Sequence, residues 1–252
     1  MKFVDEKQVG KAVDSLLTWV KSQNGRDKAR LLEDDQLLYV VVTLDKVPDQ
    51  ANITRHRIPL PHSLHPLDGA QEICLFVKDG RLGGLSKTEV KAKLLAEGLS
   101  NVTKVIDAEK LSKNYNTHEG RRKLCGSYDL FLCDDRIFAK MPKYLGKIFW
   151  KKKKWPLSVK LTRKEWKGQI TAACNSSEFE LGRGSCSVVK AARVSQSKDE
   201  IMSNLKAIIE GVAAHTPRKW GGIQALYLKS VDSVALPIYQ AIPEQPLKLD
   251  GF

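Results

Sequence analysis

The chain has 252 residues, of which 42 are lysine or arginine and 29 are aspartate or glutamate, so its formal net charge is +13. This length allows two domains of ordinary size. The positive charge makes a polyanion, either nucleic acid or an anionic membrane surface, the expected class of partner. No apolar run approaches the roughly 20 residues of a membrane-spanning helix, and residues 1–10 lack the apolar core of a secretory signal. We therefore expect a soluble, intracellular protein.

The cysteines form no C-x-x-C pair, and their odd number in an intracellular chain indicates reduced thiols. They are Cys74, Cys125, Cys133, Cys174 and Cys186.

The first quarter of the chain predicts one helix followed by two strands. Apolar residues recur at helical spacing between residues 5 and 22. The short, β-branched run LLYVVVTL at residues 37–44 favours a buried strand, and residues 55–60 alternate as a second strand. Residues 61–69 combine two prolines, an aspartate and a glycine, which is typical of a connection.

A strand followed by a helix then occurs three times. The pairs span residues 72–77 and 86–97, residues 102–106 and 108–115, and residues 128–133 and 135–149. Parallel strands need such helical crossovers, so the repetition predicts a small parallel α/β layer.

The last third predicts a return to another kind of domain. Residues 157–161 are extended and are interpreted as the crossing back. A helix at 163–173, strands at 179–181 and 185–194, a helix at 198–215 and strands at 223–229 and 235–240 follow. Adjacent strands without intervening helices indicate an α+β domain with antiparallel pairs. Capping boxes support three helix starts, at Ser86 with Glu89, Thr162 with Glu165, and Ser197 with Glu200.

Three stretches resemble the ribosomal L-one family in the same order. They are RHRIPLPHSL at residues 55–64, Leu-Gly-Lys at 145–147 before Pro156, and residues 184–240. The segments CSVV at 186–189 and SVALPIY at 233–239 are most similar to the nucleolar ribosomal L-one domain-containing proteins. The resemblance covers nearly the whole chain.

This resemblance implies a fold class of α/β and α+β, with two domains. Residues 1–67 and 157–252 would form a discontinuous outer α+β domain that binds RNA, and residues 68–156 an inserted, doubly wound (Rossmann-like) α/β domain. It further implies a monomer that binds precursor ribosomal RNA beside other assembly factors in nucleolar pre-ribosomal particles, with no enzymatic activity, cofactor or membrane partner.

The same resemblance places Lys190, Arg193, Ser230 and Ser233 on the RNA-facing edge of the outer domain. Ordinary polar positions on strand faces are the alternative interpretation. Two departures affect this edge. Residues 234–237 replace the family's Thr-Met-Gly-Pro turn and keep only the proline, and Ala192 and Arg193 stand where the family has Gly-Lys. Loss of the turn glycine removes backbone freedom for a close approach to RNA.

Basic residues concentrate between residues 134 and 194, where fifteen lysines and arginines face five acidic residues. Such a concentration is expected of a protein that neutralises phosphates. The candidate RNA contacts here are Lys151, Lys152, Lys153, Lys154, Arg163, Lys164 and Lys167. The lysine run is equally typical of a solvated turn or a nuclear import signal. Trp150, Trp155 and Trp166 are candidate base-stacking residues, although tryptophans more often pack in a core.

Other chemistry is not indicated. The segment GRLGGLSKT at residues 80–88 lacks the glycine before the lysine of a phosphate loop, and Ser86 is better explained as a helix cap. His118 and Cys125 have no context that predicts an activated thiol. Three histidines near the first crossing lack partners at metal-ligand spacing; they are His56, His62 and His65.

Two alternatives to an assembly factor remain open. One is a structural protein of the mature large-subunit stalk, which the lost Thr-Met-Gly turn disfavours. The other is a regulator that uses the same fold to bind proteins, for which RNA would be absent from isolated complexes.

Overall fold

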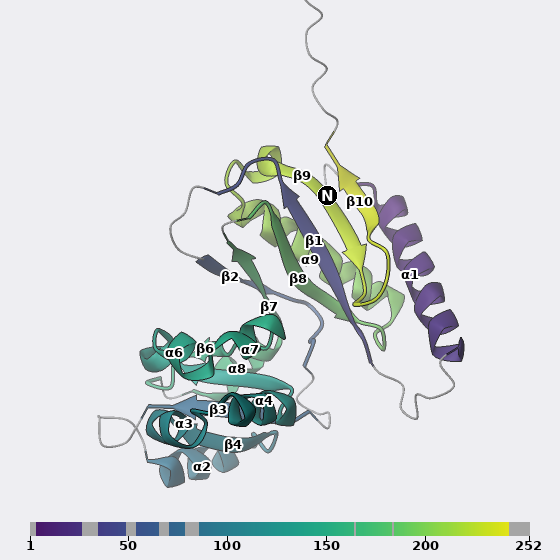
Figure 1. Ribbon diagram of the computed structural model, residues 1–252. Helices are drawn as coiled ribbons and strands as arrows, with labels where there is room; N and C mark the ends of the chain where they lie inside the picture. The colour runs from purple at the N-terminus through teal and green to yellow at the C-terminus, as the bar shows by residue number, and fades with distance from the viewer. Residues whose placement is uncertain are drawn as a thin grey trace, which may run out of the picture. The chain divides into compact units, whose positions relative to one another are not determined.

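The computed structural model describes residues 4–26, 35–48, 54–65, 71–78, 86–163, 165–182 and 184–241. The chain divides into two compact units (Figure 1). We call Met1–Leu64 with Ser176–Phe252 the outer unit, and His65–Asn175 the inserted unit. In the described residues no helix is both long and apolar enough to cross a membrane.

The outer unit is built on a four-stranded antiparallel sheet in the order β10-β9-β1-β8. Its strands are β1 (Leu37–Leu44), β8 (Cys186–Arg193), β9 (Ile223–Lys229) and β10 (Leu236–Gln240). A two-stranded sheet pairs β2 (Thr54–Pro59) with β7 (Ser176–Leu181). The helices are α1 (Glu6–Arg26), α9 (Lys198–His215) and the short 3-10 helix η2 (Lys219–Gly222).

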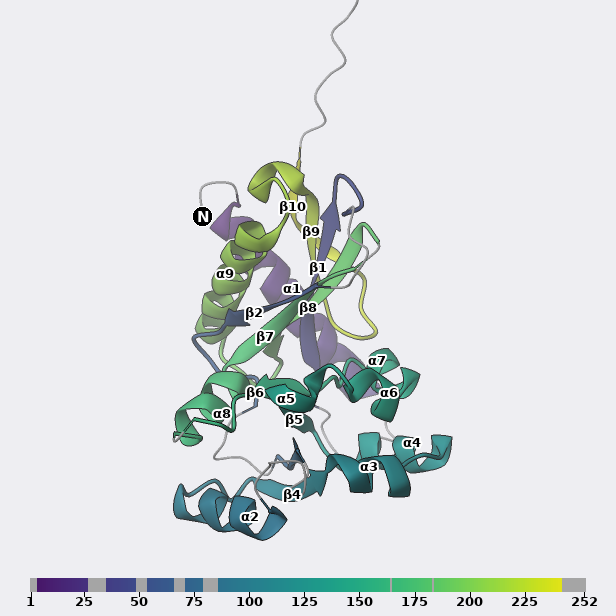
Figure 2. The same cartoon turned by 90° about the vertical axis from the view of Figure 1, so that its left-hand side faces the viewer.

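Alternation along β1 decides which face of the large sheet is covered. Leu38, Val40, Val42 and Leu44 are buried in one core with apolar residues of α1 and α9, whereas the intervening residues are half-buried. Figure 2 shows both helices on the same side of the sheet. An antiparallel sheet commonly packs one face and leaves the other to solvent or a partner, so the face of β1 that carries Tyr39 is the open one.

The inserted unit is a parallel sheet covered on both faces by helices. Its strand order is β4-β3-β5-β6, and all three pairings are parallel. The strands are β3 (Ile73–Val77), β4 (Val102–Asp107), β5 (Leu130–Asp134) and β6 (Leu157–Val159). This arrangement confirms the predicted doubly wound α/β layer.

Two separate cores identify the helices on each face. One holds residues of α2 (Lys87–Ala96) and α8 (Lys167–Cys174). The other holds residues of α3 (Ala108–Asn114), α4 (His118–Ser127), α5 (Asp135–Phe138), α6 (Met141–Leu145) and α7 (Lys147–Lys151). Figure 2 shows these two groups on either side of the strands.

The predicted crossing back at residue 157 is wrong. Leu157–Val159 pair with β5 as the fourth parallel strand, and α8 then packs on the inserted sheet, so the outer unit resumes at Ser176. The predicted helix at 135–149 is also wrong, because it is three short helices. Pro142 lies in the first turn of α6, and Gly146 between α6 and α7 has φ +69°, a conformation that L-residues rarely adopt.

Two predicted capping boxes are confirmed and one is wrong. Ser86 and Ser197 each accept a hydrogen bond from a glutamate backbone N–H, and the glutamate side chain bonds back. Thr162 caps no helix, because α8 begins only at Lys167. The carboxylate of Glu97 instead accepts hydrogen bonds from the backbone N–H groups of Trp166 (3.0 Å) and Lys167 (2.6 Å).

Candidate nucleic-acid interface

The open face of the outer sheet carries two rows of side chains across three strands. In one row, Tyr39 on β1 lies between Lys190 on β8 and Lys229 on β9. In the next row, Val41 lies between Val188 and Tyr227. Flat aromatic rings beside cations can stack on unpaired bases and hold the adjoining phosphates.

Lys190 sits at the edge of this face in a charged neighbourhood. It is half-buried and pairs in register with Tyr39. Burial raises the pKa of the nearby Glu178 carboxyl, while the charges of Arg55, Arg57 and Lys190 oppose that rise. Burial also raises the pKa of the Tyr39 hydroxyl, and the Arg193 charge opposes it. With its pKa raised above the usual value of about 10, the Tyr39 hydroxyl is neutral at physiological pH.

Arg193 is used within the protein. Its Nε donates a 2.6 Å hydrogen bond to the carbonyl of Leu64, and its Nη1 lies 3.2 Å from a carboxylate oxygen of Asp35. The same carboxylate accepts a 3.0 Å hydrogen bond from the backbone of Ser195. With 16% of its side chain exposed, Arg193 ties the end of β8 to two other segments, and a direct RNA contact by its guanidinium would compete with these bonds.

Ser230 and Ser233 likewise serve the loop between β9 and β10. Ser233 Oγ accepts a 2.8 Å hydrogen bond from the Ser230 backbone N–H, and Ser230 Oγ donates to the side chain of Gln36 at 3.3 Å. Both serines are buried, whereas Val231 and Val234 in the same loop are 55% and 78% exposed. The serines hold the loop, and the valines form its outer surface.

The predicted lysine run separates into one structural residue and three exposed ones. Lys154 Nζ donates hydrogen bonds to the carbonyls of Cys125 (3.3 Å) and Tyr128 (2.8 Å), and so caps the end of α4. Lys151, Lys152 and Lys153 are exposed. Residues 135–154 contain eight basic residues and one acidic residue, which makes α5, α6 and α7 a strongly basic segment of the inserted unit.

The three candidate tryptophans differ in exposure. Trp166 is fully buried, and its Nε1 donates to the carbonyls of Leu161 (3.1 Å) and Arg163 (2.9 Å). It is a core residue, so its proposed stacking role is wrong. Trp150 is 37% exposed and packs edge-to-face against Trp155, with ring centroids 5.7 Å apart.

The structure does not gather all the predicted basic residues on one face. Arg163 and Lys167 are exposed, but Lys167 begins α8, which covers the opposite face of the inserted sheet from α7. Lys164 lies outside the described residues. We therefore treat Lys151–Lys153 as one group, separate from Arg163 and Lys167.

Sequence reasoning missed the aromatic rows of the outer sheet. Tyr39 lies inside a run interpreted as a buried strand, and Tyr227 belongs to another predicted strand; no face was assigned to either residue. The sequence did contain a signal for the open face. In LLYVVVTL the two polar residues, Tyr39 and Thr43, are an even number of residues apart, so they lie on the same face of the strand. The strand order that brings Tyr39, Tyr227 and the two lysines together is not encoded locally.

The other candidates show no activated group. His118 is the exposed first residue of α4, and burial raises the pKa of the Cys125 thiol above its usual range. The rings of His56 and His215 stack at 4.4 Å, and no cluster of three metal-ligating side chains occurs in the described residues. Residues 79–85 of the glycine-rich segment lie outside the described ranges, and Ser86 is confirmed as a cap.

The chain is thus a two-domain protein, in which an α+β domain carries an inserted, doubly wound α/β domain. Both domains present basic side chains, and the outer one also presents tyrosines. The profile of the ribosomal protein L1p/L10e family matches residues 20–234. The chain belongs to this family.

Relatives with assigned names extend this result. The chain is 30% identical over 241 residues to the Ribosomal L1 domain-containing protein 1 of Mus musculus, with 94% of this chain and 52% of the mouse protein covered. It is 31% identical to a Schizosaccharomyces pombe protein named for ribosome biogenesis, covering 84% of this chain and 57% of that protein. Ribosome biogenesis protein UTP30 of Saccharomyces cerevisiae is 23% identical over 83% of each chain. The chain thus spans about half the length of the mouse and fission-yeast relatives.

Proposed function

We propose that this protein is a ribosome-biogenesis factor that binds precursor ribosomal RNA in nucleolar pre-ribosomal particles, beside other assembly factors and without catalysing a reaction. The proposal rests on one observation: this chain belongs to a ribosomal protein family, and it is similar to proteins that are named for ribosome biogenesis. The mouse relative is named only for its domain, and the yeast names state the process and no ligand.

The open face of the outer sheet supports RNA as the ligand. Tyr39 and Tyr227 occupy neighbouring rows, and Lys190 and Lys229 flank Tyr39. Each base stacked on an aromatic ring contributes about 1–3 kcal/mol, with little dependence on sequence. An unpaired stretch of ribosomal RNA is the class of ligand that matches such a surface.

The basic helices of the inserted unit support a second, less specific contact. Lys151, Lys152 and Lys153 are exposed and follow each other at the end of α7. Lysines that neutralise phosphates release counterions, so their contribution appears as salt dependence of the affinity. We assign them phosphate contacts, and we assign the stacking contacts to the outer sheet.

In-cell crosslinking with sequencing of the bound RNA tests the proposal. Wild type should crosslink to precursor ribosomal RNA, and a Tyr39→Leu, Tyr227→Leu variant should lose most of that signal. A variant with Lys11→Glu and Lys206→Glu, two exposed lysines on the covered side of the outer unit, is the control and should keep it. Crosslinks to mature stalk RNA alone would assign the protein to the finished subunit, and an absence of RNA would leave a protein-binding role.

Filter binding with a purified precursor fragment separates the two surfaces. Reversing Lys151, Lys152 and Lys153 to glutamate should lower the dependence of log affinity on log salt by about 0.7 for each phosphate that the variant no longer neutralises. The tyrosine variant should weaken binding about tenfold or more at every salt concentration without changing this slope. Equal slopes for all variants would contradict the assignment of phosphate contacts to α7.

A further inference from the structure

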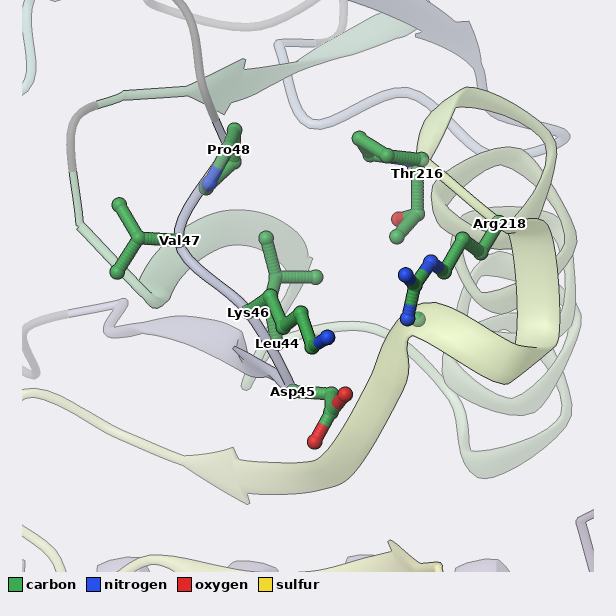
Figure 3. Close-up of a pocket in the computed structure, with 9 residues that line it drawn as sticks. Leu44, Asp45, Lys46, Val47, Pro48, Thr216 and Arg218 are labelled. Atoms are coloured by element: carbon green, nitrogen blue, oxygen red, sulfur yellow. The ribbon is translucent and has the colours of Figure 1, made fainter.

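A hollow of about 400 Å³ opens where β1 ends, between the segment after β1 and the turn that follows α9. Figure 3 shows Pro48 on one side, Thr216 on the other and Leu44 between them. The charged tips of Asp45, Lys46 and Arg218 lie together beside this apolar part. The hollow therefore offers an apolar slot next to two cations and one carboxylate.

The backbone around the hollow is held in an unusual conformation. Arg218 and Lys219 have φ angles of +64° and +53°, in the left-handed region that L-residues rarely occupy. A Cβ at Gly222 would lie 2.1 Å from the carbonyl oxygen of Pro217, and the Gly222 carbonyl accepts a 3.0 Å hydrogen bond from the backbone N–H of Asp45. Strained residues persist where the surroundings over-determine them, and they cluster at functional sites.

The charged side chains at the hollow lie near one another without forming an ion pair. Among the described residues, the side chains of Asp45, Lys46 and Arg218 take part in no ion pair or hydrogen bond. All three residues are exposed, as is Lys219. A ligand with an anionic group and a hydrogen-bond donor would find both complements available without breaking an internal contact.

We propose that this hollow binds one unpaired guanine nucleotide of the RNA, which makes the inference rest on the proposed function. The guanine ring enters between Pro48 and the Thr216 side, above Leu44. The Asp45 carboxylate accepts hydrogen bonds from the two adjacent N–H donors on the guanine edge, because a carboxylate can accept two parallel bonds. Lys46 and Arg218 bind the nucleotide phosphate.

Asp45 decides between a nucleotide and an acidic peptide. Lys46 and Arg218 would attract either ligand, but the carboxylate of Asp45 would repel an aspartate or glutamate side chain. In a nucleotide, the negative charge lies on the phosphate and N–H donors lie on the base, so both signs of charge at the hollow are used. Adenine presents one amino group on the same edge, which predicts a preference for guanine.

The hollow is a second site on the outer unit. β1 begins beside the network of Asp35, Gln36 and Arg193 and ends at Leu44, which lines the hollow. Tyr39 precedes Leu44 by five residues along β1. At about 3.4 Å per residue this places the two sites roughly 17 Å apart, so a nucleotide in the hollow and a base on the Tyr39 row would be different nucleotides of one RNA.

Titration of the ¹⁵N-labelled full chain with guanosine 5′-monophosphate tests the site. We expect amide shifts in residues 44–48 and 216–222, weaker shifts with adenosine 5′-monophosphate and none with inorganic phosphate at the same concentration. Arg218→Gly, which suits the positive φ, should weaken binding at least tenfold. Asp45→Asn should remove the preference for guanine, and Lys206→Gln on α9 is the control that should change nothing.

Four results would overturn the inference. They are an absence of shifts around the hollow, equal shifts with inorganic phosphate, tighter binding of an Asp-rich peptide that Asp45→Asn strengthens, and guanosine triphosphate binding more tightly than an oligoribonucleotide with one unpaired guanine. The last would replace RNA by a free nucleotide. RNA crosslinking that depends on Tyr39 and Tyr227, together with no nucleotide binding at the hollow, would contradict this inference alone and leave the proposed function intact.

Discussion

Replacing Arg193 with alanine should destabilise the outer unit rather than only weaken RNA binding. The change removes the 2.6 Å bond to the Leu64 carbonyl and the 3.2 Å ion pair with Asp35. A charge-assisted hydrogen bond contributes about 1.5–3 kcal/mol. The Asp35 pair adds at most about 1 kcal/mol, because the aspartate is 36% exposed. We expect a loss of about 2–4 kcal/mol.

Native-state hydrogen exchange is the appropriate assay, because it reports each unit separately. Amides of β1 and β8 should lose protection in Arg193→Ala, whereas amides of β3 and β5 should not. Arg193→Lys should recover little, since lysine cannot reproduce the guanidinium geometry, and Lys206→Ala should stay within about 0.5 kcal/mol of wild type. Unchanged protection together with tenfold weaker RNA binding would show that Arg193 contacts RNA and that the structural argument fails.

Three further outcomes are expected from single groups. Lys154→Met should destabilise the inserted unit by about 1–2 kcal/mol through loss of the α4 cap, measured by exchange of α4 amides, while the exposed Lys153→Met should not. Burial, and then the neighbouring His215, lower the pKa of His56 from 6.5. The folded state therefore resists protonation, so urea titrations should show stability that is full above about pH 6.5 and falls as pH drops, and His56→Gln should flatten this trend. In native protein Cys186 should react with a thiol reagent at pH 8 well before the four buried cysteines, because burial raises the pKa of Cys74, for example, to about 12.

Periodicity and capping residues were enough to predict the elements whose signals are local. Helix α9 and strand β1 have the predicted bounds, because each has a regular apolar pattern and α9 has a complete capping box. The start of α8 could not be predicted this way. Its cap is Glu97, about 70 residues earlier in the chain, and a fold-level contact of this kind leaves no local pattern in the sequence.

The roles of side chains in the candidate site also depend on contacts with distant residues, which the sequence does not show locally. The family resemblance selected Arg193, Ser230 and Ser233, and the structure places them in a hydrogen-bonded network with Asp35 and Gln36. Sequence position alone does not distinguish a side chain that contacts RNA from one that positions the segment. The difference depends on hydrogen-bond partners such as the Leu64 carbonyl, which is 129 residues from Arg193 in the sequence.

Two adjacent glycines at the end of η2, Gly221 and Gly222, allow a test of whether nucleotide binding depends on the conformation of the turn that lines the hollow. A Cβ at Gly222 would meet the Pro217 carbonyl oxygen at 2.1 Å, whereas a Cβ at Gly221 would have nothing within 4 Å. Gly222→Ala must move backbone, so it should cost about 1–3 kcal/mol. Gly221→Ala should be neutral or stabilise by up to about 1 kcal/mol, because it restricts the unfolded chain.

Thermal unfolding of the two variants, with guanosine 5′-monophosphate titrations at a temperature where both are folded, completes the comparison. Gly222→Ala displaces the Pro217–Gly222 turn that carries Arg218, so its nucleotide affinity should fall even when the folded fraction is full. Gly221→Ala leaves the turn in place and should bind as wild type does. If both variants bound equally well, the turn geometry would be irrelevant to the hollow, and the strain at Arg218 and Lys219 would need an explanation within the fold of the outer unit alone.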